Sequence, residues 1–449
     1  MARPPRLSGK DKDTFAYFTI RDRMPVILTK AIDTVHKHAG RMLRDGKKDV
    51  STDCSLIVER LSKLKNEMLT NKQLSHLEDG GDDEYDWNAL CDHIKTATET
   101  EPTWFETSWL FAECYMYRRI HEAIVLSSVC KDFDPFEEQK QQAYFGSQTS
   151  ILQLAECFGS FTDRAKRSAS EKAFSTLSAD FERALKLSLW GNKTDLSILA
   201  KYDGSEDLSK LQTSSIDSLK QLDSKLLVDD THDTFDLLLN SIQSDPQRER
   251  GRIDIVLDNS GYELFNDLCL ADWLLCAGFA TIVHLHIKCF PWFVSDATRR
   301  DFDWLLDQLH SSDNPHLRRL GENWHAYVSS GSWNVREHKF WTLPHEFVHM
   351  KTLACDLYEG LAKSNLVIMK GDLNYRKLLA DRHWPHDVSF VKGLDGFSPA
   401  PILALRSLKA ELVVGLKPGQ DRDVAKQDGD WMISGQYAVV QLQKSNENI

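Results

Sequence analysis

The stretch from Ile253 to Glu263 places a series of oxygen-bearing side chains directly after a mainly apolar run. The run ends on Asp258 and Asn259, and Glu263 follows at a distance of about one helical turn. In open α/β sheets, ligands bind beyond the carboxyl ends of parallel strands, and hard divalent cations prefer oxygen ligands. Asp258 and Asn259 are therefore candidate metal ligands. A plain turn after a strand would have a similar composition, because Asn-Ser-Gly is ordinary turn chemistry.

Two later apolar runs end in a similar way. Residues 365–370 lead into Asp372, which could cap a following helix, and then into Arg376. Residues 402–405 lead into a segment that ends at Lys409. A helix N-terminus with a nearby cation suits a phosphate group. Either cation alone would most simply be solvated surface, but three polar strand ends in one half of the chain favour a shared site.

The elements that must position these residues follow from the hydrophobic periodicity. Apolar residues at three-four spacing predict a helix over residues 110–124, and Pro25 suits the first turn of a helix over residues 26–35. After residue 253, strands alternate with helical patterns such as residues 261–275, which favours right-handed βαβ crossovers. We therefore predict an α/β protein with a doubly wound, mainly parallel sheet and flanking helices. Its expected parts are a helical N-terminal domain (1–200), a polar connector with helical segments (201–252), and an α/β metal- and phosphate-binding catalytic domain (253–449).

Composition restricts the class of partner. The formal net charge of -12 over 449 residues argues against nucleic acid, which needs a basic surface. No apolar run is long enough to span a membrane, and no hydrophobic signal segment follows Met1. The nine cysteines are scattered and include no CxxC pair, so we expect reduced thiols in the cytoplasm, with the nucleus left open as a second compartment. A phosphorylated substrate would need a concentrated positive site on so acidic a protein.

Three other patterns invite a functional interpretation. His345–His349 matches the HExxH pattern of zinc proteases, but no clear third ligand follows it. His284 and His286 form an HxH pair that could bind metal, although a polar strand face covered by the helical half is the simpler interpretation. The acidic run of residues 78–86 has no ligand spacing, and we expect a solvated loop.

The sequence resembles the metal-dependent damage-control phosphatase family, first catalogued as a domain of unknown function. It is most similar to the third subfamily, whose members are also described as acidic-residue (protein-glutamate) O-methyltransferases. Nearly the whole chain takes part, through the strings Phe15–Pro25, Leu189–Ser197, Asp258–Glu263 and Gly371–Arg376. The subfamily signature Arg-Thr-x-Lys is Arg406-Ser-Leu-Lys409 here, and the serine keeps the hydroxyl.

This resemblance implies roles for individual residues. The metal, Mn²⁺, Ni²⁺, Co²⁺ or Mg²⁺, would be held by Asp258, Asn259 and Asp296, although Asp296 on its own would look like a helix N-cap. The catalytic set would be these three residues and Lys409. The implied substrate contacts comprise the same three residues with Glu263, Asp372, Leu373, Asn374, Tyr375, Arg376 and Lys409.

The expected reaction is metal-assisted hydrolysis of small phosphorylated metabolites, which by resemblance would be sugar phosphates such as fructose 1-phosphate and fructose 6-phosphate. The nucleophile stays open between a water activated by the metal and Asp258 itself. The main alternative is a protein-glutamate O-methyltransferase that uses S-adenosylmethionine, but no glycine-rich turn follows Leu257. A haloacid-dehalogenase mechanism is disfavoured because Ser260 stands where a second Asp is needed. A zinc protease and a helical protein-interaction module without an identified protein partner are the remaining alternatives.

Overall fold

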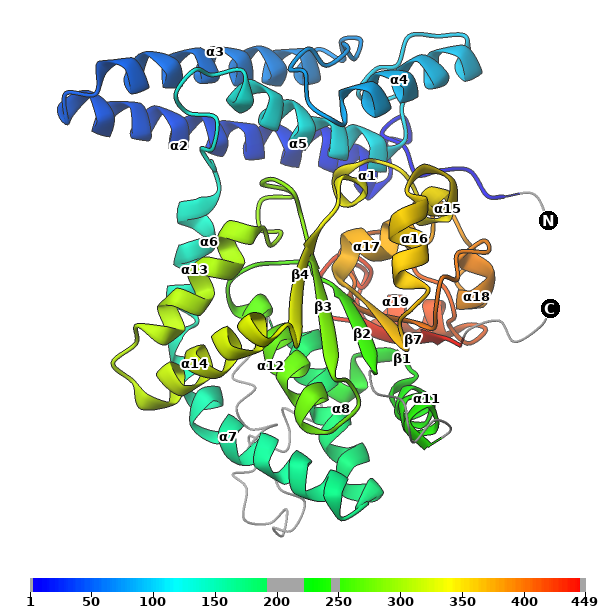
Figure 1. The fold of residues 1–449 in the computed structure, drawn as a ribbon. Helices are drawn as coiled ribbons and strands as arrows, with labels where there is room; N and C mark the ends of the chain where they lie inside the picture. The colour runs from blue at the N-terminus through cyan, green and yellow to red at the C-terminus, as the bar shows by residue number, and fades with distance from the viewer. Residues whose placement is uncertain (1–2, 192–221, 244–250, 445–449) are drawn as a thin grey trace.

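The computed structural model describes residues 3–191, 222–243 and 251–444. Helices from the first half of the chain lie at one end of a central sheet and along one of its faces (Figure 1). The mixed α/β architecture confirms the predicted fold class. No helix in these ranges is long and apolar enough to cross a lipid bilayer.

The first half of the described chain is helical, as the periodicity predicts. Two of its long helices, α2 and α3, pair as a hairpin at the top of Figure 1, and Pro25 occupies the first turn of α2. The elements are α1 (Phe15–Phe18), the π-helical turn η1 (Thr19–Arg23), α2 (Met24–Arg44), α3 (Lys48–Leu69), α4 (Glu84–Thr98), α5 (Trp109–Val125), α6 (Glu137–Gly146), α7 (Gln148–Ser170) and α8 (Phe174–Trp190).

A seven-stranded sheet in the order β1-β7-β6-β5-β2-β3-β4 forms the centre of the molecule. All neighbouring strands are parallel except β6 and β7, which pair antiparallel. The strands are β1 (Leu226–Asp229), β2 (Arg252–Val256), β3 (Ile282–Ile287), β4 (Trp333–Glu337), β5 (Leu366–Lys370), β6 (Ile402–Ser407) and β7 (Ala438–Gln443). From β2 the chain builds β3 and β4 on one side, and then β5 and β6 on the other. The carboxyl end of β2 is therefore a topological switch point, where ligands bind in open α/β sheets.

Helices and short turns connect these strands. They are α11 (Thr231–Gln243), α12 (Tyr262–Cys276), α13 (Arg299–His310), α14 (Pro315–Ser330), η3 (Lys339–Thr342), η4 (Phe347–His349), α15 (Met350–Leu353), α16 (Cys355–Leu361), α17 (Gly371–Leu378), α18 (Phe390–Gly393) and α19 (Gln420–Gln427).

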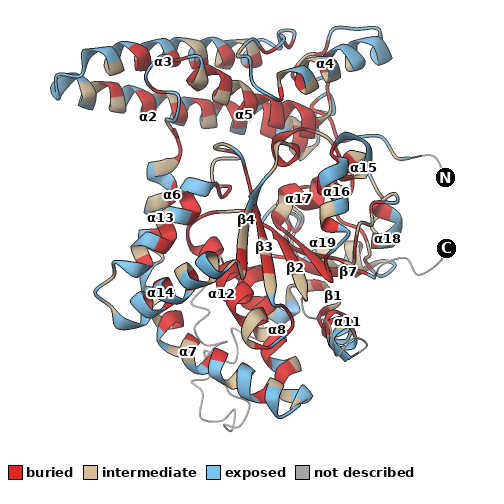
Figure 2. Cartoon of the chain, in the orientation of Figure 1, coloured by how far each residue is buried: buried red, intermediate tan, exposed pale blue. Residues whose placement is uncertain are grey.

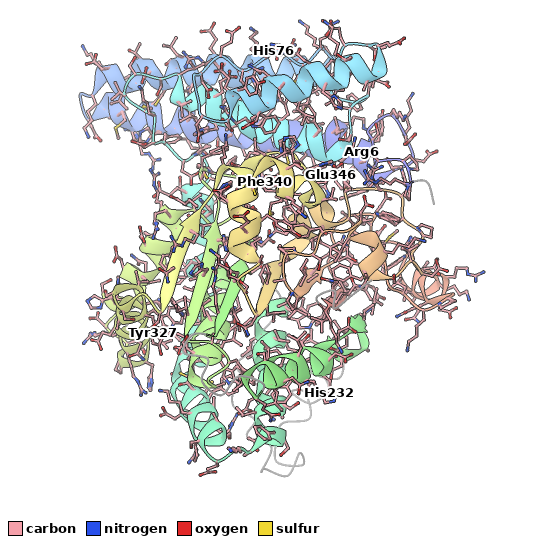
Figure 3. The ribbon with its side chains drawn as sticks, turned by 45° about the vertical axis from the view of Figure 1, so that its right-hand side comes forward. Arg6, His76, His232, Tyr327, Phe340 and Glu346 are labelled. Carbon is pink, nitrogen blue, oxygen red and sulfur yellow. The ribbon has the colours of Figure 1, made fainter. Side chains whose placement is uncertain are left out.

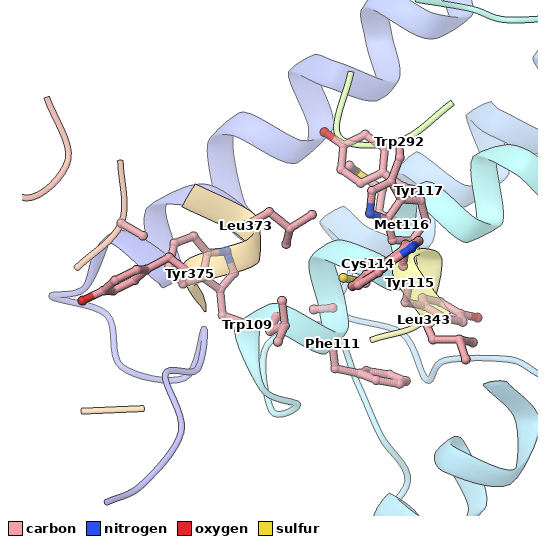
Figure 4. Packing of buried hydrophobic residues seen from close by; sticks show 14 of the residues in the cluster. Trp109, Phe111, Cys114, Tyr115, Met116, Tyr117, Trp292, Leu343, Leu373 and Tyr375 are labelled. Atoms are coloured by element: carbon pink, nitrogen blue, oxygen red, sulfur yellow. The ribbon is translucent and has the colours of Figure 1, made fainter. Parts of the chain in front are cut away.

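Two apolar cores cover the two faces of the sheet, as the buried segments of Figure 2 show. Successive side chains of β2 point alternately into one core and into the other, because neighbouring side chains of a strand lie on opposite faces of the sheet. Ile253 and Ile255 pack with α7, α8 and α12, whereas Val256 packs with the core that contains α5 and α17. Figure 4 shows Trp109 and Tyr117 of α5 in that second core, near Leu373 and Tyr375 of α17. The first half of the chain therefore contributes to both cores.

The predicted connector, residues 201–252, lies partly outside the described residues. Within the described part, β1 pairs with β7 and so belongs to the sheet. The three domain boundaries stay a prediction. The acidic run of residues 78–86 differs from the solvated loop that we expect, because Asp79 and Asp83 are buried in ion pairs with Arg118. Those pairs anchor the segment before α4 to α5.

Candidate active site

Asp258 lies just beyond the carboxyl end of β2, at the switch point of the sheet, and is buried. Its neighbour across the switch point is Gly371, the first residue of α17. A Cβ atom at Gly371 would lie 1.9 Å from Asp258 Oδ2, and the φ angle of Gly371 is +84°. Glycine is required here for two reasons: there is no room for a Cβ atom, and the backbone is in the left-handed region. The start of α17, with its unpaired N–H groups, therefore lies directly against the Asp258 carboxylate.

Asn259 and Asp296 are brought together by an isolated antiparallel bridge between their backbones. The Ala297 N–H donates to Asp258 O over 2.8 Å, which fixes the segment after β3 to the segment after β2. Asn259 Nδ2 donates to Asp258 Oδ2 over 2.9 Å, and Asn259 Oδ1 accepts from Ser295 Oγ over 2.5 Å. The three predicted metal ligands thus lie in the segments that follow two neighbouring strands, β2 and β3.

Glu263, in the first turn of α12, faces the same cluster. Its Oε2 accepts from Asn259 Nδ2 over 2.8 Å. The helix begins after Gly261, whose φ angle of +67° makes the sharp exit from the strand. The short connection explains why Glu263 is close to Asp258 and Asn259, as their spacing in the sequence predicts.

Two buried lysines that sequence reasoning did not assign to the site contact its carboxylates. Lys288 Nζ lies 3.0 Å from Asp296 Oδ2 and donates to Leu257 O over 3.0 Å. Lys370 Nζ lies 3.1 Å from Asp267 Oδ1 and 3.7 Å from Glu263 Oε1. Lys288 directly follows β3, and Lys370 is the last residue of β5. Their position at the carboxyl ends of parallel strands is the signal that could have identified them.

Burial and like charge dominate the electrostatics of this cluster. Burial, together with the Asp296 and Glu263 carboxylates, raises the pKa of Asp258 well above its ordinary value. Burial also raises the pKa of Asp296, although Lys288 opposes it. Burial lowers the pKa of Lys370, but Asp267 and Glu263 outweigh it and raise that pKa overall. Buried carboxylates held this close together are stabilised in their charged form by a cation.

The donor set fits a divalent metal. Asp258, Asn259 and Asp296 offer only oxygen atoms as ligands, which hard cations such as Mg²⁺ and Mn²⁺ prefer. The local charge agrees as well, because four carboxylates (Asp258, Glu263, Asp267 and Asp296) face two buried ammonium groups (Lys288 and Lys370), which leaves an excess of two negative charges if all are ionised.

Lys409 lies on the loop after β6 and lines a cavity of about 430 Å³ together with Asn259, Ser260 and Ser295. We call this space the active-site cavity. The backbone N–H of Lys409 donates to Asp372 Oδ1 over 3.1 Å, and Arg406 Nε donates to the same oxygen over 2.8 Å. Arg406 is fully buried and also donates to Ala410 O over 3.1 Å. Arg406 and Asp372 therefore hold the loop that carries Lys409, a role that the strand-end pattern alone does not reveal.

The side chains of residues 373–376 are directed into the protein. Leu373 is in the apolar core, and Tyr375 Oη donates to Gln441 Oε1 over 2.7 Å. Asn374 Nδ2 donates to Lys370 O over 2.7 Å. The assignment of these residues as substrate contacts stays a prediction, and their burial favours contacts through the backbone rather than the side chains.

Arg376 is the predicted site residue whose surroundings differ most from expectation. Its guanidinium donates to Glu113 Oε2 over 2.6 Å and to both Asp381 oxygens over 2.9 Å, and it stacks on Trp109 at 3.6 Å. Its assignment as a substrate contact stays a prediction, and these buried ion pairs count against it.

A second group of potential metal ligands lies further back along the strands, where ligand atoms of Asp254, His284 and His286 come within 4.8 Å of one another. Arg252 donates to both Asp254 oxygens over 2.7 Å, and His286 Nε2 lies 2.7 Å from Asp254 Oδ1. The pKa of Asp254 falls to about 2, because hydrogen bonds from His286 and Arg252 outweigh the effect of burial. A guanidinium that occupies both carboxylate oxygens opposes a cation there, so this group is more consistent with an ion-pair network.

The HExxH segment does not form the helix that such zinc sites need. Glu346 has an extended backbone before the short turn η4, so His345 and His349 are not one turn of an α-helix apart. Glu346 accepts from Arg6 Nε over 2.7 Å and pairs with His349 over 2.8 Å; Figure 3 shows Arg6 and Glu346 side by side. Among the described residues, the HExxH histidines belong to no group with metal-ligand spacing.

The fold and the site together define an α/β protein with a buried cluster of carboxylate and amide side chains at the switch point of its sheet. Comparisons with known proteins agree with the resemblance seen in the sequence. The profile of the damage-control phosphatase ARMT1-like domain matches residues 19–424. The chain is 42% identical to the damage-control phosphatase ARMT1 of Bos taurus over 447 residues, which cover 98% of this chain and 99% of that one. It is 41% identical to the Homo sapiens protein of that name, with 98% of each chain covered.

A DUF89-family protein of Pyrococcus horikoshii, known from its crystal structure, is 18% identical and aligns with a TM-score of 0.39 over 81% of this chain and 90% of that one. The near-complete match to the profile and to full-length relatives shows that the chain belongs to the ARMT1-like damage-control phosphatase family. It is accordingly a phosphatase that acts on phosphoric monoesters, and the family implies a divalent metal.

Proposed function

We propose that the protein hydrolyses small sugar phosphates, such as fructose 1-phosphate and fructose 6-phosphate, with a divalent metal held by Asp258, Asn259 and Asp296. The observation that carries this proposal is the convergence of these three oxygen donors at the switch point, beside the N-terminus of α17 and the cavity that Lys409 lines. Mn²⁺, Ni²⁺, Co²⁺ and Mg²⁺ are all compatible with the donor atoms. When bound, the cation would draw charge from the phosphoryl oxygens and make a nearby water more acidic.

The protein's own groups account for the rest of the phosphate charge. Lys409 lines the active-site cavity and supplies an ammonium group for a phosphoryl oxygen. The unpaired backbone N–H groups at the start of α17, at Asp372 and Leu373, supply donors and the positive end of the helix dipole. Asp372 itself acts indirectly, because it fixes the Lys409 backbone.

Glu263 is suited to the sugar. Its carboxylate lies next to Asn259, at the edge of the metal cluster, and can accept hydrogen bonds from sugar hydroxyls. Lys288 holds Asp296 in place and balances part of its charge. We place the protein in the cytoplasm, with the nucleus left open, and expect no nucleic-acid partner. The S-adenosylmethionine alternative gains no support from the turn after β2, where Gly261 is the one glycine between Leu257 and Tyr262.

Phosphate release from a panel of sugar phosphates, with and without added Mn²⁺, tests this proposal. We expect metal-dependent release from fructose 1-phosphate and fructose 6-phosphate, and no transfer of label from S-adenosylmethionine to protein carboxylates in a parallel assay. Release that is the same in the presence of a chelator, or release from no sugar phosphate of the panel, would contradict the proposal.

A further inference from the structure

A second cavity adjoins the active-site cavity. It has a volume of about 300 Å³, and the two cavities share Gln139, Val294 and Ser295 in their walls. The far side is formed by η1 and α2, which contribute Arg23 and Lys30. We call this space the distal cavity. A ligand bound at Asn259 and Lys409 could therefore extend past Ser295 towards the N-terminal helices.

The distal cavity is positively charged. Arg23 and Lys30 are exposed, and within the described residues no carboxylate forms an ion pair with either one. The one carboxylate that the described residues contribute to its wall is Glu113, which shares the buried Arg376 with Asp381, so Arg23 and Lys30 still leave an excess of positive charge. This arrangement is unlike that of Arg118 and Arg376, which are enclosed by carboxylates. Two exposed cations that have no carboxylate partner among the described residues therefore line the same space and offer positive charge to an anionic ligand.

The backbone around this space is also unusual. Arg23 ends a π-helical turn, and such turns occur often at functional sites. Phe293 and Val294, in the wall, have φ angles of 44° and 70°, a region that a β-branched residue rarely adopts. Phe293 is held there by stacking on Tyr117 at 4.6 Å between ring centroids. Such strain persists where the surrounding structure enforces it, commonly at ligand sites. The strained Val294 lies in the wall that the two cavities share.

From these observations we propose that Arg23 and Lys30 form a second anion subsite, which binds a phosphate group at the end of the substrate remote from the one that is hydrolysed. The preferred substrates would then be sugar bisphosphates. A guanidinium binds phosphate through paired N–H donors, and an ammonium adds a point charge, so the pair suits a dianion. This inference rests on the proposed function, because it places the reacting phosphate at Lys409 and the metal ligands.

The test compares fructose 1,6-bisphosphate with fructose 1-phosphate in steady-state kinetics with Mn²⁺. We expect the wild type to prefer the bisphosphate. Arg23→Gln should lower kcat/KM for the bisphosphate about tenfold more than for the monophosphate, mainly through KM, because a charge-assisted hydrogen bond to the remote phosphate is lost. Lys30→Gln should shift the same ratio in the same direction.

The matched control is Arg21→Gln. Arg21 belongs to the same π-helical turn and carries the same charge, but it is paired with Asp22 and does not line the cavity. For Arg21→Gln, the ratio of kcat/KM for the bisphosphate to kcat/KM for the monophosphate should equal that of the wild type. Equal losses on both substrates in Arg23→Gln, or an equal shift in Arg21→Gln, would overturn the subsite. If the wild type hydrolyses neither compound, the proposed function fails. Calorimetric titration of both ligands in the presence of Mn²⁺ then tests the subsite alone, because Arg23→Gln should weaken binding of the bisphosphate more than binding of the monophosphate.

Discussion

Gly371 and Asp258 lie so close together that a single added methyl group would overlap the carboxylate. The two residues follow the neighbouring parallel strands β2 and β5, which meet at the switch point. The close approach brings the start of α17 to the predicted metal ligands without any intervening side chain. It also makes the glycine as necessary to the site as the aspartate.

Gly371→Ala should therefore destabilise the protein by more than about 2 kcal/mol, since alanine meets both an unfavourable φ angle and the Asp258 carboxylate. Urea denaturation gives the stability, and calorimetry gives the Mn²⁺ affinity, which should fall as Asp258 is displaced. Gly396→Ala is the control, because Gly396 has a similar φ angle of +92° and open space around it. Equal effects of the two substitutions would show that contact with Asp258 has no consequence.

Asp258→Asn should reduce the affinity for Mn²⁺ by more than about tenfold in a calorimeter, with little change in the far-ultraviolet spectrum. The variant keeps the shape of the side chain and removes the charge that attracts the cation. Asp254→Asn, within β2 and in the ion-pair network with Arg252, should bind Mn²⁺ as the wild type does. The reverse result, a loss of metal in Asp254→Asn alone, would move the metal site to the group with His284 and His286.

Lys409→Ala should lower kcat/KM for a sugar phosphate by about 100-fold, because the ammonium group stabilises phosphoryl charge that is redistributed in the transition state. Lys409→Arg should recover part of this loss. Lys417→Ala removes an exposed lysine that lines neither cavity and should match the wild type. Steady-state kinetics at saturating Mn²⁺ measure all three variants, and a Lys409→Ala enzyme within about threefold of the wild type would remove Lys409 from the site.

The pH dependence of stability should report the Asp254 network. The pKa of Asp254 is lowered in the folded protein to about 2, so the ionised form adds stability above the ordinary pKa near 4, on the order of 2 kcal/mol. This contribution is lost as the pH falls from about 4 towards 2. Urea unfolding at several pH values should show wild type and Asp254→Asn diverging above pH 4 and converging below it. A constant difference across this range would mean that the charge of Asp254 is not what stabilises the fold.

His345→Ala and His349→Ala should each retain metal-dependent phosphatase activity within about threefold of the wild type, because their surroundings form an ion pair and an aromatic contact rather than a metal site. Metal analysis of the purified protein should find no zinc that depends on either histidine. Stoichiometric zinc that disappears in one variant would revive the protease interpretation.

The parts of the structure that the sequence predicts are those that depend on local pattern. The strands around Asp258 and Lys370 and the helix after Gly261 follow from apolar periodicity and from glycine at the exit of a strand. The sequence does not predict β7, and its antiparallel pairing with β6 depends on contacts that no local pattern reveals. The sequence likewise predicts the oxygen donors of the site but not their buried counter-charges.

Arg376 illustrates the limit. In the sequence it is a cation just inside a helix that follows a strand, which is where a phosphate contact would be expected. Its partner Glu113 is 263 positions earlier in the chain, so only tertiary packing decides that the guanidinium points into the protein. Lys288 and Lys370 show the opposite case. We did not assign either lysine to the site from the sequence, but in the fold each is buried against carboxylates of the site.

Leu7, which precedes α1, and Phe15, its first residue, are tied to both halves of the chain. The N–H of Leu7 donates to Asp381 O, its carbonyl accepts from the N–H of Trp109, and the N–H of Phe15 donates to Glu411, two residues beyond Lys409. Contacts this distant in sequence form late and slowly, because a long loop must close first. During synthesis on the ribosome, the N-terminal helices would therefore emerge long before their partners exist. The loop that carries Lys409 can take its final position only after β7, whose preceding residue Tyr437 bonds to Leu408, has been made.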